Sequence, residues 1–284
     1  MLVRKLSGDT PKTVLPKGAT DTQMHLYLPD YPAEAGGPPV PEGTPGPDDY
    51  RQVMEWLGID RVVVTQGNAH QFNNDCLLAC VAAMGPVARG VAVITSDTPD
   101  AEMKRLHEGG IRGARIMDLA GGAVGLDGLA GVDARAHDFG WTVAVQFDGS
   151  RILAHMPKLE AIESRYIIDH HGKFFSGTTP DSAEVDAVKR LIDRGNCWFK
   201  FAGCYESSRT GGPDYSDIAA VARKIAAYAP ERIIWGTNWP HNQVRRTEDY
   251  PDDAGLLDLV LGWAPQSALQ SVLVDSPARL FDFD

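Results

Sequence analysis

The sequence has few cysteines, with four among its 284 residues. Cys76, Cys80, Cys197 and Cys204 form no pair of CxxC motifs, and the chain is much longer than the small secreted domains that depend on disulfides. Cys76 and Cys80 are four residues apart in an apolar stretch, so they would share one face of a buried helix. We therefore expect reduced thiols, a cytoplasmic location and no chemistry from these side chains.

Long apolar runs and an excess of positive charge are also missing. No segment approaches the roughly 20 apolar residues of a membrane-spanning helix, and residues 1–19 lack the apolar core of a secretory signal. The formal net charge of -11 at pH 7 argues against a surface that follows the phosphates of a nucleic acid. We expect neither a membrane nor a nucleic acid as partner, and we predict that residues 1–19 form a flexible arm.

From residue 20 onward, short β-branched runs alternate with longer amphipathic segments, which is typical of a parallel sheet with crossover helices. One closed barrel of about 250 residues suits this length, whereas an open doubly wound sheet would usually show a GxGxxG loop, and none follows a strand here. We predict an α/β fold, a single (β/α)₈ barrel over residues 20–284, with a C-terminal helix and tail on its outside. The eight predicted strands lie at residues 21–28, 61–68, 90–96, 113–119, 142–148, 165–172, 197–203 and 232–240.

The loop from Pro29 to Asp49, between the first strand and its helix, is dense in proline and glycine. Loops of this length are usually functional or disordered. In a barrel this loop lies at the carboxyl ends of the strands, where active sites are built. We interpret it as a lid over a site, and the alternative is a surface loop without a role.

Polar side chains gather at the ends of six predicted strands, which would form one ring around the barrel mouth. Any single histidine or arginine there could be structural or solvated, so the prediction rests on the agreement of the strands. His107, His137 and His155 fall in predicted helices and are taken as structural, and His70 is a weaker candidate. The ring comprises Gln23, His25, Arg115, Asp118, Gln146, Asp148, Asp169, His170, His171, Lys173, Lys200, Tyr205, Glu206, Arg209, Asn238 and His241.

Four motifs carry a family resemblance: TDxxxH in the first strand, DHHG after the sixth, WFKFAG in the seventh and WGTNWPHN in the eighth. From Asp21 to Phe281 the chain resembles the amidohydrolase-superfamily lactonases typified by 2-pyrone-4,6-dicarboxylate lactonase. Gln23 stands where the wider superfamily has the first histidine of HxH, and Asn238 stands where relatives have aspartate. Since His25 and His170 then lack a third ligand of known position, the resemblance predicts no bound metal and no other cofactor.

Within this branch, the replacement of aspartate by the neutral Asn238 makes the chain resemble the galactarolactone isomerases. An amide cannot take a proton from water as a carboxylate can. The resemblance therefore implies conversion of D-galactaro-1,5-lactone into the 1,4-lactone, in the breakdown of galacturonate and galactarate. Three alternatives stay open: a metal-independent lactonase for an aldaric or pyrone-type lactone, an inactive sugar-acid-binding protein, and a metal-dependent amidase or decarboxylase.

In such an isomerisation a hydroxyl of the substrate attacks its own ester carbonyl, so the protein supplies a proton shuttle and hydrogen-bond donors. The resemblance implies His170 as the shuttle, with His25 and Asn238 as further catalytic residues. The expected partner is a small anionic sugar lactone, and the oligomeric state, homo-oligomers included, is left open. For His241 there is an alternative, in which it lies behind the residues that touch substrate. The predicted substrate contacts are Gln23, Arg115, Gln146, Lys173, Lys200, Tyr205, Arg209 and His241.

Overall fold

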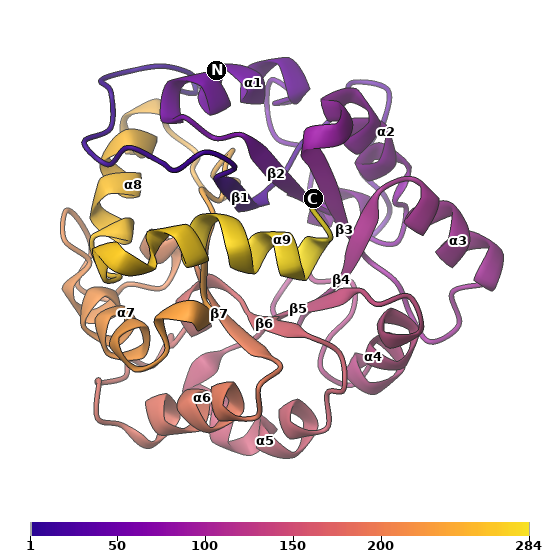
Figure 1. Ribbon diagram of the computed structural model, residues 1–284. Coiled ribbons are helices and arrows are strands. Elements are labelled where there is room, and N and C mark those ends of the chain that lie inside the picture. Colours follow the sequence, from indigo (N-terminus) through magenta and orange to yellow (C-terminus); the bar gives the residue numbers. More distant parts are fainter. Residues whose placement is uncertain (1, 284) are drawn as a thin grey trace.

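A sheet of eight parallel strands forms the centre of the computed structural model, which describes residues 2–283 (Figure 1). The strands are neighbours in chain order, as expected where every crossover is a short helix-containing connection. Their bounds are β1 Thr20–Met24, β2 Arg61–Thr65, β3 Ala88–Ala92, β4 Ile111–Met117, β5 Thr142–Gln146, β6 Tyr166–Ile168, β7 Cys197–Phe201 and β8 Ile233–Trp235.

Hydrogen bonds between β1 and the segment after β8 close this sheet into a barrel. The Asn238 N–H donates to the Gln23 carbonyl (2.7 Å), and the His25 N–H donates to the Trp239 carbonyl (2.8 Å). Met24 and Trp239 form a parallel bridge at the same place. The predicted (β/α)₈ barrel is confirmed, and its closing seam carries three of the predicted site residues.

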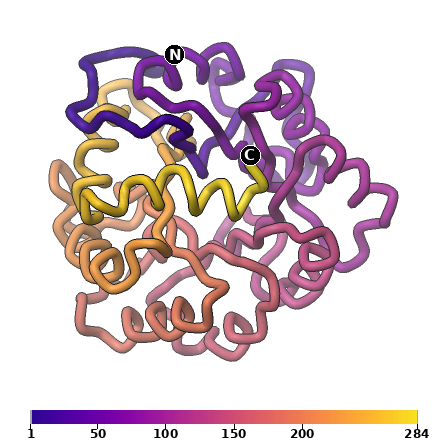
Figure 2. Tube along the Cα trace, viewed as in Figure 1, coloured from indigo at the N-terminus to yellow at the C-terminus, as the bar shows by residue number. Residues whose placement is uncertain are grey.

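Helices on the outside cover the strands as a ring (Figures 1 and 2). Each presents an apolar face to the sheet; in α6 the buried residues include Val185, Val188 and Leu191, and the Ser182 hydroxyl caps the helix at the Val185 N–H. None of the helices in residues 2–283 is long and apolar enough to cross a bilayer. The helices are α1 Pro47–Leu57, α2 Asp75–Met84, α3 Asp100–Glu108, α4 Leu129–Asp138, α5 Ile152–Glu160, α6 Ala183–Asp193, α7 Ser216–Tyr228, α8 Asp253–Leu261 and α9 Ser276–Phe281.

The short helix α9 crosses the amino-terminal opening of the barrel (Figure 1). Leu280, Phe281 and Phe283 form one buried apolar cluster with residues that point inward from the strands. The sequence predicted a helix on the outside of the barrel, and this placement is a correction. The helix closes the opening because its last apolar residues complete the lowest layer of the interior. The strand residues of the cluster are Val63, Val91, Ala144, Ile167, Trp198 and Ile234.

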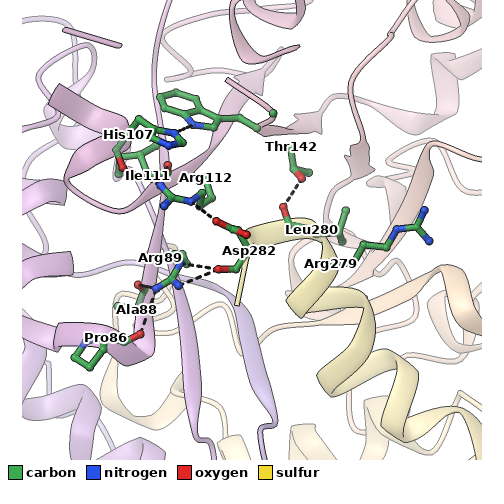
Figure 3. Close-up of polar contacts among 12 residues, drawn as sticks. Pro86, Ala88, Arg89, His107, Ile111, Arg112, Thr142, Arg279, Leu280 and Asp282 are labelled. Atoms are coloured by element: carbon green, nitrogen blue, oxygen red, sulfur yellow. Dashed lines mark hydrogen bonds and ion pairs between the residues drawn. The ribbon is translucent and has the colours of Figure 1, made fainter. Parts of the chain in front are cut away.

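Polar contacts at the starts of three strands hold the chain after α9 (Figure 3). Arg89 donates from Nε (3.2 Å) and Nη2 (2.9 Å) to the Asp282 carbonyl, and Arg112 Nε donates to its carboxylate (3.1 Å). The Thr142 hydroxyl donates to the Leu280 carbonyl (2.6 Å). This end of the barrel is therefore filled, and a ligand can reach the interior only from the carboxyl ends of the strands.

Replacing Phe281 with alanine is expected to lower the free energy of unfolding by about 3–5 kcal/mol, because a buried aromatic ring is lost and a cavity remains. Phe281 is 1% exposed, whereas Phe72 is 54% exposed and provides a matched control whose replacement should change stability by less than about 0.5 kcal/mol. Urea denaturation measures both values. Equal stability of the two variants would contradict the role given to α9.

Residues 2–19 form no helix or strand and lie against the barrel. The Val3 N–H donates to the Thr247 hydroxyl (3.0 Å), the Thr13 N–H to Asp258 (2.7 Å) and the Gly18 N–H to Asp60 (2.6 Å). Contacts therefore run along much of the segment. The division of the chain into a flexible arm and a barrel domain stays a prediction.

Candidate functional site

A cavity of about 600 Å³ opens at the carboxyl ends of the strands. Residues 38–42 form part of its wall, so the long loop after β1 covers the site as the lid interpretation expected. Other wall residues that the sequence analysis did not single out include Tyr27, Asn68 and Arg245. The predicted site residues that line the cavity are His25, Arg115, Gln146, His170 and Asn238, together with Glu206.

His25, just after β1, is buried with its imidazole orientation fixed by the backbone. Its Nδ1–H donates to the Thr65 carbonyl (2.9 Å), which leaves Nε2 as the unprotonated nitrogen. Burial, with the nearby charge of Arg115, lowers the pKa of His25 to about 3. At neutral pH this side chain is therefore a neutral hydrogen-bond acceptor on the cavity wall.

Gln23 and Lys200 lie behind His25 and do not line the cavity, and their contact with substrate stays a prediction. The Lys200 ammonium donates to Gln23 Oε1 (2.8 Å) and pairs with the Asp169 carboxylate (2.7 Å). The ammonium therefore fixes the amide so that Gln23 Nε2 lies 3.5 Å from His25 Nε2. Because Lys200 is buried and already neutralised, it serves the site by orienting Gln23.

His170, Asn238 and Glu206 form a second group on the cavity wall. His170 Nε2 lies 3.0 Å from Asn238 Oδ1, and Asn238 Nδ2 donates to Glu206 Oε1 (2.9 Å). Burial opposes ionisation of Glu206, but its close ion pair with Lys173 lowers its pKa below the usual value. Lys173 thus pairs with Glu206, and its predicted role in binding substrate stays a prediction.

The ionised Glu206 determines which nitrogen of His170 carries the proton. A carboxylate only accepts hydrogen bonds, so Asn238 must turn its NH₂ group to Glu206 and its carbonyl oxygen to His170. His170 then donates from Nε2–H, and its Nδ1 has no hydrogen-bond partner among residues 2–283. Burial, with the charge of Lys173, lowers the pKa of His170 well below its ordinary value, so the ring is neutral with a free lone pair on Nδ1.

Two strained turns present these residues. His170, His171 and Lys173 after β6 have positive φ angles of 50°, 52° and 45°, and Asn238 and His241 after β8 have values of 63° and 57°. Non-glycine residues rarely adopt this left-handed conformation, and it concentrates at functional sites. The strain marks the same two turns that carry the DHHG and NWPHN motifs.

Tyr205 and His241 do not line the cavity, in line with the alternative given for His241, and substrate contact by either residue stays a prediction. Tyr205 Oη accepts from Asn238 Nδ2 (2.9 Å) and lies 2.5 Å from His241 Nδ1. His241 in turn lies 3.0 Å from Asp253 Oδ1 at the start of α8. The sequence analysis missed Asp253, because the pair Asp252 and Asp253 has the composition of an ordinary helix start.

Arg115 on β4 is the buried cation of the cavity. Its Nη1 donates to the Gln66 carbonyl and to Asn68 Oδ1 (both 2.8 Å), and its Nη2 donates to Gln146 Oε1 (3.1 Å). The Nε–H has no partner among the described residues. Arg115 is therefore held rigidly, and it places a positive charge on the cavity wall.

Arg209, the other arginine predicted to hold a carboxylate, is exposed and does not line the cavity. It donates from Nη1 to the Ser176 carbonyl (2.8 Å), and Asp217 holds its backbone N–H (2.7 Å). These contacts turn the loop after β7 outward. Arg245, in the loop after β8, provides a second guanidinium at the cavity instead.

Other polar residues at strand ends shape turns. Asp118 accepts from the Leu126 N–H (3.1 Å), and Asp148 accepts from the Ser150 N–H (3.0 Å). His70 is buried beside Tyr27, with Nδ1 3.2 Å from the Pro32 carbonyl. These contacts give the three residues structural roles.

A closed barrel with neutral imidazoles, an amide and a rigid arginine at its carboxyl end is the arrangement of an amidohydrolase-type enzyme. Residues 20–283 match the model of the amidohydrolase family, and the chain belongs to that family. It is 59% identical to the D-galactarolactone isomerase of Agrobacterium fabrum (strain C58 / ATCC 33970), over 99% of this chain and 96% of the relative. It is 30% identical to a 2-pyrone-4,6-dicarboxylate hydrolase of Comamonas testosteroni, over 95% and 92%.

A solved structure gives the same result for the fold. An apo crystal structure from Agrobacterium tumefaciens is similar with a TM-score of 0.97 and 57% identity, covering 99% of both chains. An amidohydrolase of Burkholderia multivorans with bound zinc, at 17% identity and a TM-score of 0.66, shares the fold. Whether this chain can bind a metal therefore has to be judged from its own residues.

The residues at the strand ends do not fit a divalent metal. Gln23 offers one amide oxygen, which already accepts from Lys200, and the Lys200 ammonium would repel a second cation. Asn238 is neutral, with its carbonyl and amide groups engaged by His170 and Glu206. Within residues 2–283, no three histidine, cysteine, aspartate or glutamate side chains converge as ligands.

Proposed function

We propose that the chain is a D-galactarolactone isomerase that converts D-galactaro-1,5-lactone into D-galactaro-1,4-lactone without a metal or other cofactor. The observation that carries this proposal is the hydrogen bond of His170 to Asn238, a neutral amide at the position where hydrolysis would need an ionised carboxylate to activate water. The 59% identity to a D-galactarolactone isomerase supports the same reaction.

The reaction is an intramolecular acyl transfer. The C4 hydroxyl oxygen of the substrate bonds to C1, the carbonyl becomes a tetrahedral oxyanion, and the bond between C1 and the C5 oxygen then breaks. The proton leaves the C4 oxygen for the imidazole of His170, which lines the cavity, and is returned to the C5 oxygen, so no water is consumed. A neutral imidazole with a free lone pair suits both steps.

Two guanidinium groups attract the one free carboxylate of the substrate in this proposal. Arg115 and Arg245 both line the cavity and place positive charge on its wall. His25 accepts from a ring hydroxyl, and Gln146 keeps Arg115 in place. Holding the lactone in a conformation that brings its C4 oxygen to C1 supplies a large part of the rate.

The biological setting follows from this reaction. We propose that the enzyme serves the breakdown of galacturonate-derived sugar acids in the cytoplasm. That the protein has no nucleic-acid partner stays a prediction. The oligomeric state stays open.

Proton NMR of freshly prepared D-galactaro-1,5-lactone with the purified protein tests the function. We expect the 1,4-lactone to form before any open diacid, and faster than in a protein-free sample. Hydrolysis is the second candidate, since the Comamonas testosteroni relative is a hydrolase, and it predicts diacid as the first product. Binding without turnover would indicate a sugar-acid-binding protein.

A further inference from the structure

Three side chains behind Asn238 form a row that does not reach the cavity: Tyr205, His241 and Asp253. His241 is 0% exposed and Asp253 is 2% exposed. A buried histidine and a buried carboxylate with no contact to ligand usually have a structural role, or they act on a neighbour. Hydrogen bonds connect them through Tyr205 to the amide of Asn238, which contacts His170.

When His241 is neutral, the hydrogen bonds in this row run in one direction. Asp253 accepts from His241, so the His241 proton is on Nε2, and its Nδ1 accepts from the Tyr205 hydroxyl. Burial, followed by the charge of Glu206, raises the pKa of Tyr205 well above its ordinary value, so the hydroxyl keeps its proton. Tyr205 Oη is then available only as an acceptor on its other side, where Asn238 Nδ2 donates to it.

We propose that Tyr205, His241 and Asp253 are positioning residues that fix the Asn238 amide and thereby hold His170 in its Nε2–H tautomer. Both hydrogens of Asn238 Nδ2 are then used, one by Tyr205 and one by Glu206, and the carbonyl can only face His170. The Asp253 carboxylate also stabilises the imidazolium that forms when His170 takes the substrate proton, because each hydrogen bond in the row polarises the next one. The inference rests on the proposed isomerase reaction.

Reversing the direction of the hydrogen bonds between Asp253, His241, Tyr205 and Asn238 would disturb this arrangement. If the Asp253 side chain could donate, His241 could carry its proton on Nδ1 and donate to Tyr205 Oη. The tyrosine hydroxyl would then turn its hydrogen to Asn238, whose carbonyl would have to rotate away from His170. That rotation would place the carbonyl oxygen against the Glu206 carboxylate, which is unfavourable.

The first experiment compares Tyr205→Phe, Asp253→Asn and the double variant in the lactone assay. Each single variant is expected to lower kcat by about 10–100-fold while KM stays close to the wild-type value, because no substrate contact is lost. The double variant should be no slower than Tyr205→Phe alone, since Asp253 acts through Tyr205. Additive losses, or losses confined to KM, would overturn the proposal.

Asp252→Asn is the matched control for Asp253→Asn. Asp252 is the neighbouring residue, caps α8 by accepting from the Gly255 N–H (3.0 Å), and pairs with Lys5 on the surface. Asparagine is also a good helix cap, so this variant should keep wild-type kcat. Thermal unfolding of all variants separates a loss of fold from a loss of catalysis.

The second experiment reads the tautomer directly and needs no turnover. In protein labelled with ¹⁵N-histidine, long-range ¹H–¹⁵N NMR should show the His170 ring protonated on Nε2 alone, with the signal assigned by its absence in His170→Gln. Tyr205→Phe and Asp253→Asn should show a mixture of tautomers. Unchanged His170 signals in both folded variants would overturn the proposal, whereas the expected signals in a protein that fails to convert the lactone would reject only the proposed function.

Discussion

Replacing His170 with glutamine is expected to lower kcat for lactone isomerisation by about 10²–10⁴-fold, the range that a general acid–base group supplies. Glutamine can still donate to Asn238 Oδ1, which His170 Nε2 contacts at 3.0 Å, but it cannot carry a proton from one substrate oxygen to the other. The rate is measured by NMR after subtraction of the spontaneous reaction. A variant with kcat within threefold of wild type would remove His170 from the mechanism.

The pH profile of the wild-type enzyme is the companion measurement. Because burial and the charge of Lys173 hold the pKa of His170 well below its ordinary value, kcat/KM should stay level as the pH falls past 6.5. Activity should be lost only as the pH falls through the lowered pKa, where Nδ1 takes up a proton. His137→Gln, an exposed histidine on α4, is the matched control and should keep both kcat and this profile.

Replacing Asn238 with aspartate is expected to change the product. A carboxylate beside the lactone can take a proton from water, so open diacid should appear as a primary product, while isomerisation falls by about 10–100-fold because the chain through Tyr205 is broken. NMR separates the diacid from the two lactones. An unchanged ratio of products would contradict the role given to the neutral amide.

A variant at Glu206 provides a control for the Asn238→Asp substitution. Its Oε1 lies 2.9 Å from Asn238 Nδ2, so a second carboxylate there would share one proton with Glu206 at neutral pH. Asn238→Asp combined with Glu206→Gln should therefore release more diacid than Asn238→Asp alone. Asn238→Ala, which removes the amide without adding a base, should lose isomerisation and gain no hydrolysis.

The positions of the strands and of the polar ring could be predicted from the sequence. Period-two alternation, helix-start residues and the order of the elements determine a parallel barrel, and in that fold His25, Arg115 and His170 must meet at one end. These features are local in the chain or follow from the topology. The mouth of the barrel can therefore be assigned from the sequence.

Pairing among the polar residues could not be predicted. Lys173 and Lys200 were expected to meet the substrate, but Glu206 and Asp169 neutralise them. Which side chain faces which depends on the register between β6 and β7 and on the strained turns that follow, and neither is encoded in a local pattern. Arg209 lies away from the cavity for a similar reason, because it is held by Asp217 near its own loop and by Ser176 in the loop after β6.

The apolar cluster at the amino-terminal opening has a consequence for how the polypeptide acquires its structure on the ribosome. Val63, Val91 and the other inward-facing strand residues of that cluster stay exposed to water until Leu280, Phe281 and Phe283 have been synthesised. During elongation the incomplete chain thus exposes an apolar surface, which chaperones can bind or which can associate with other nascent chains. The exposed surface is covered only when α9 docks across the opening of the barrel.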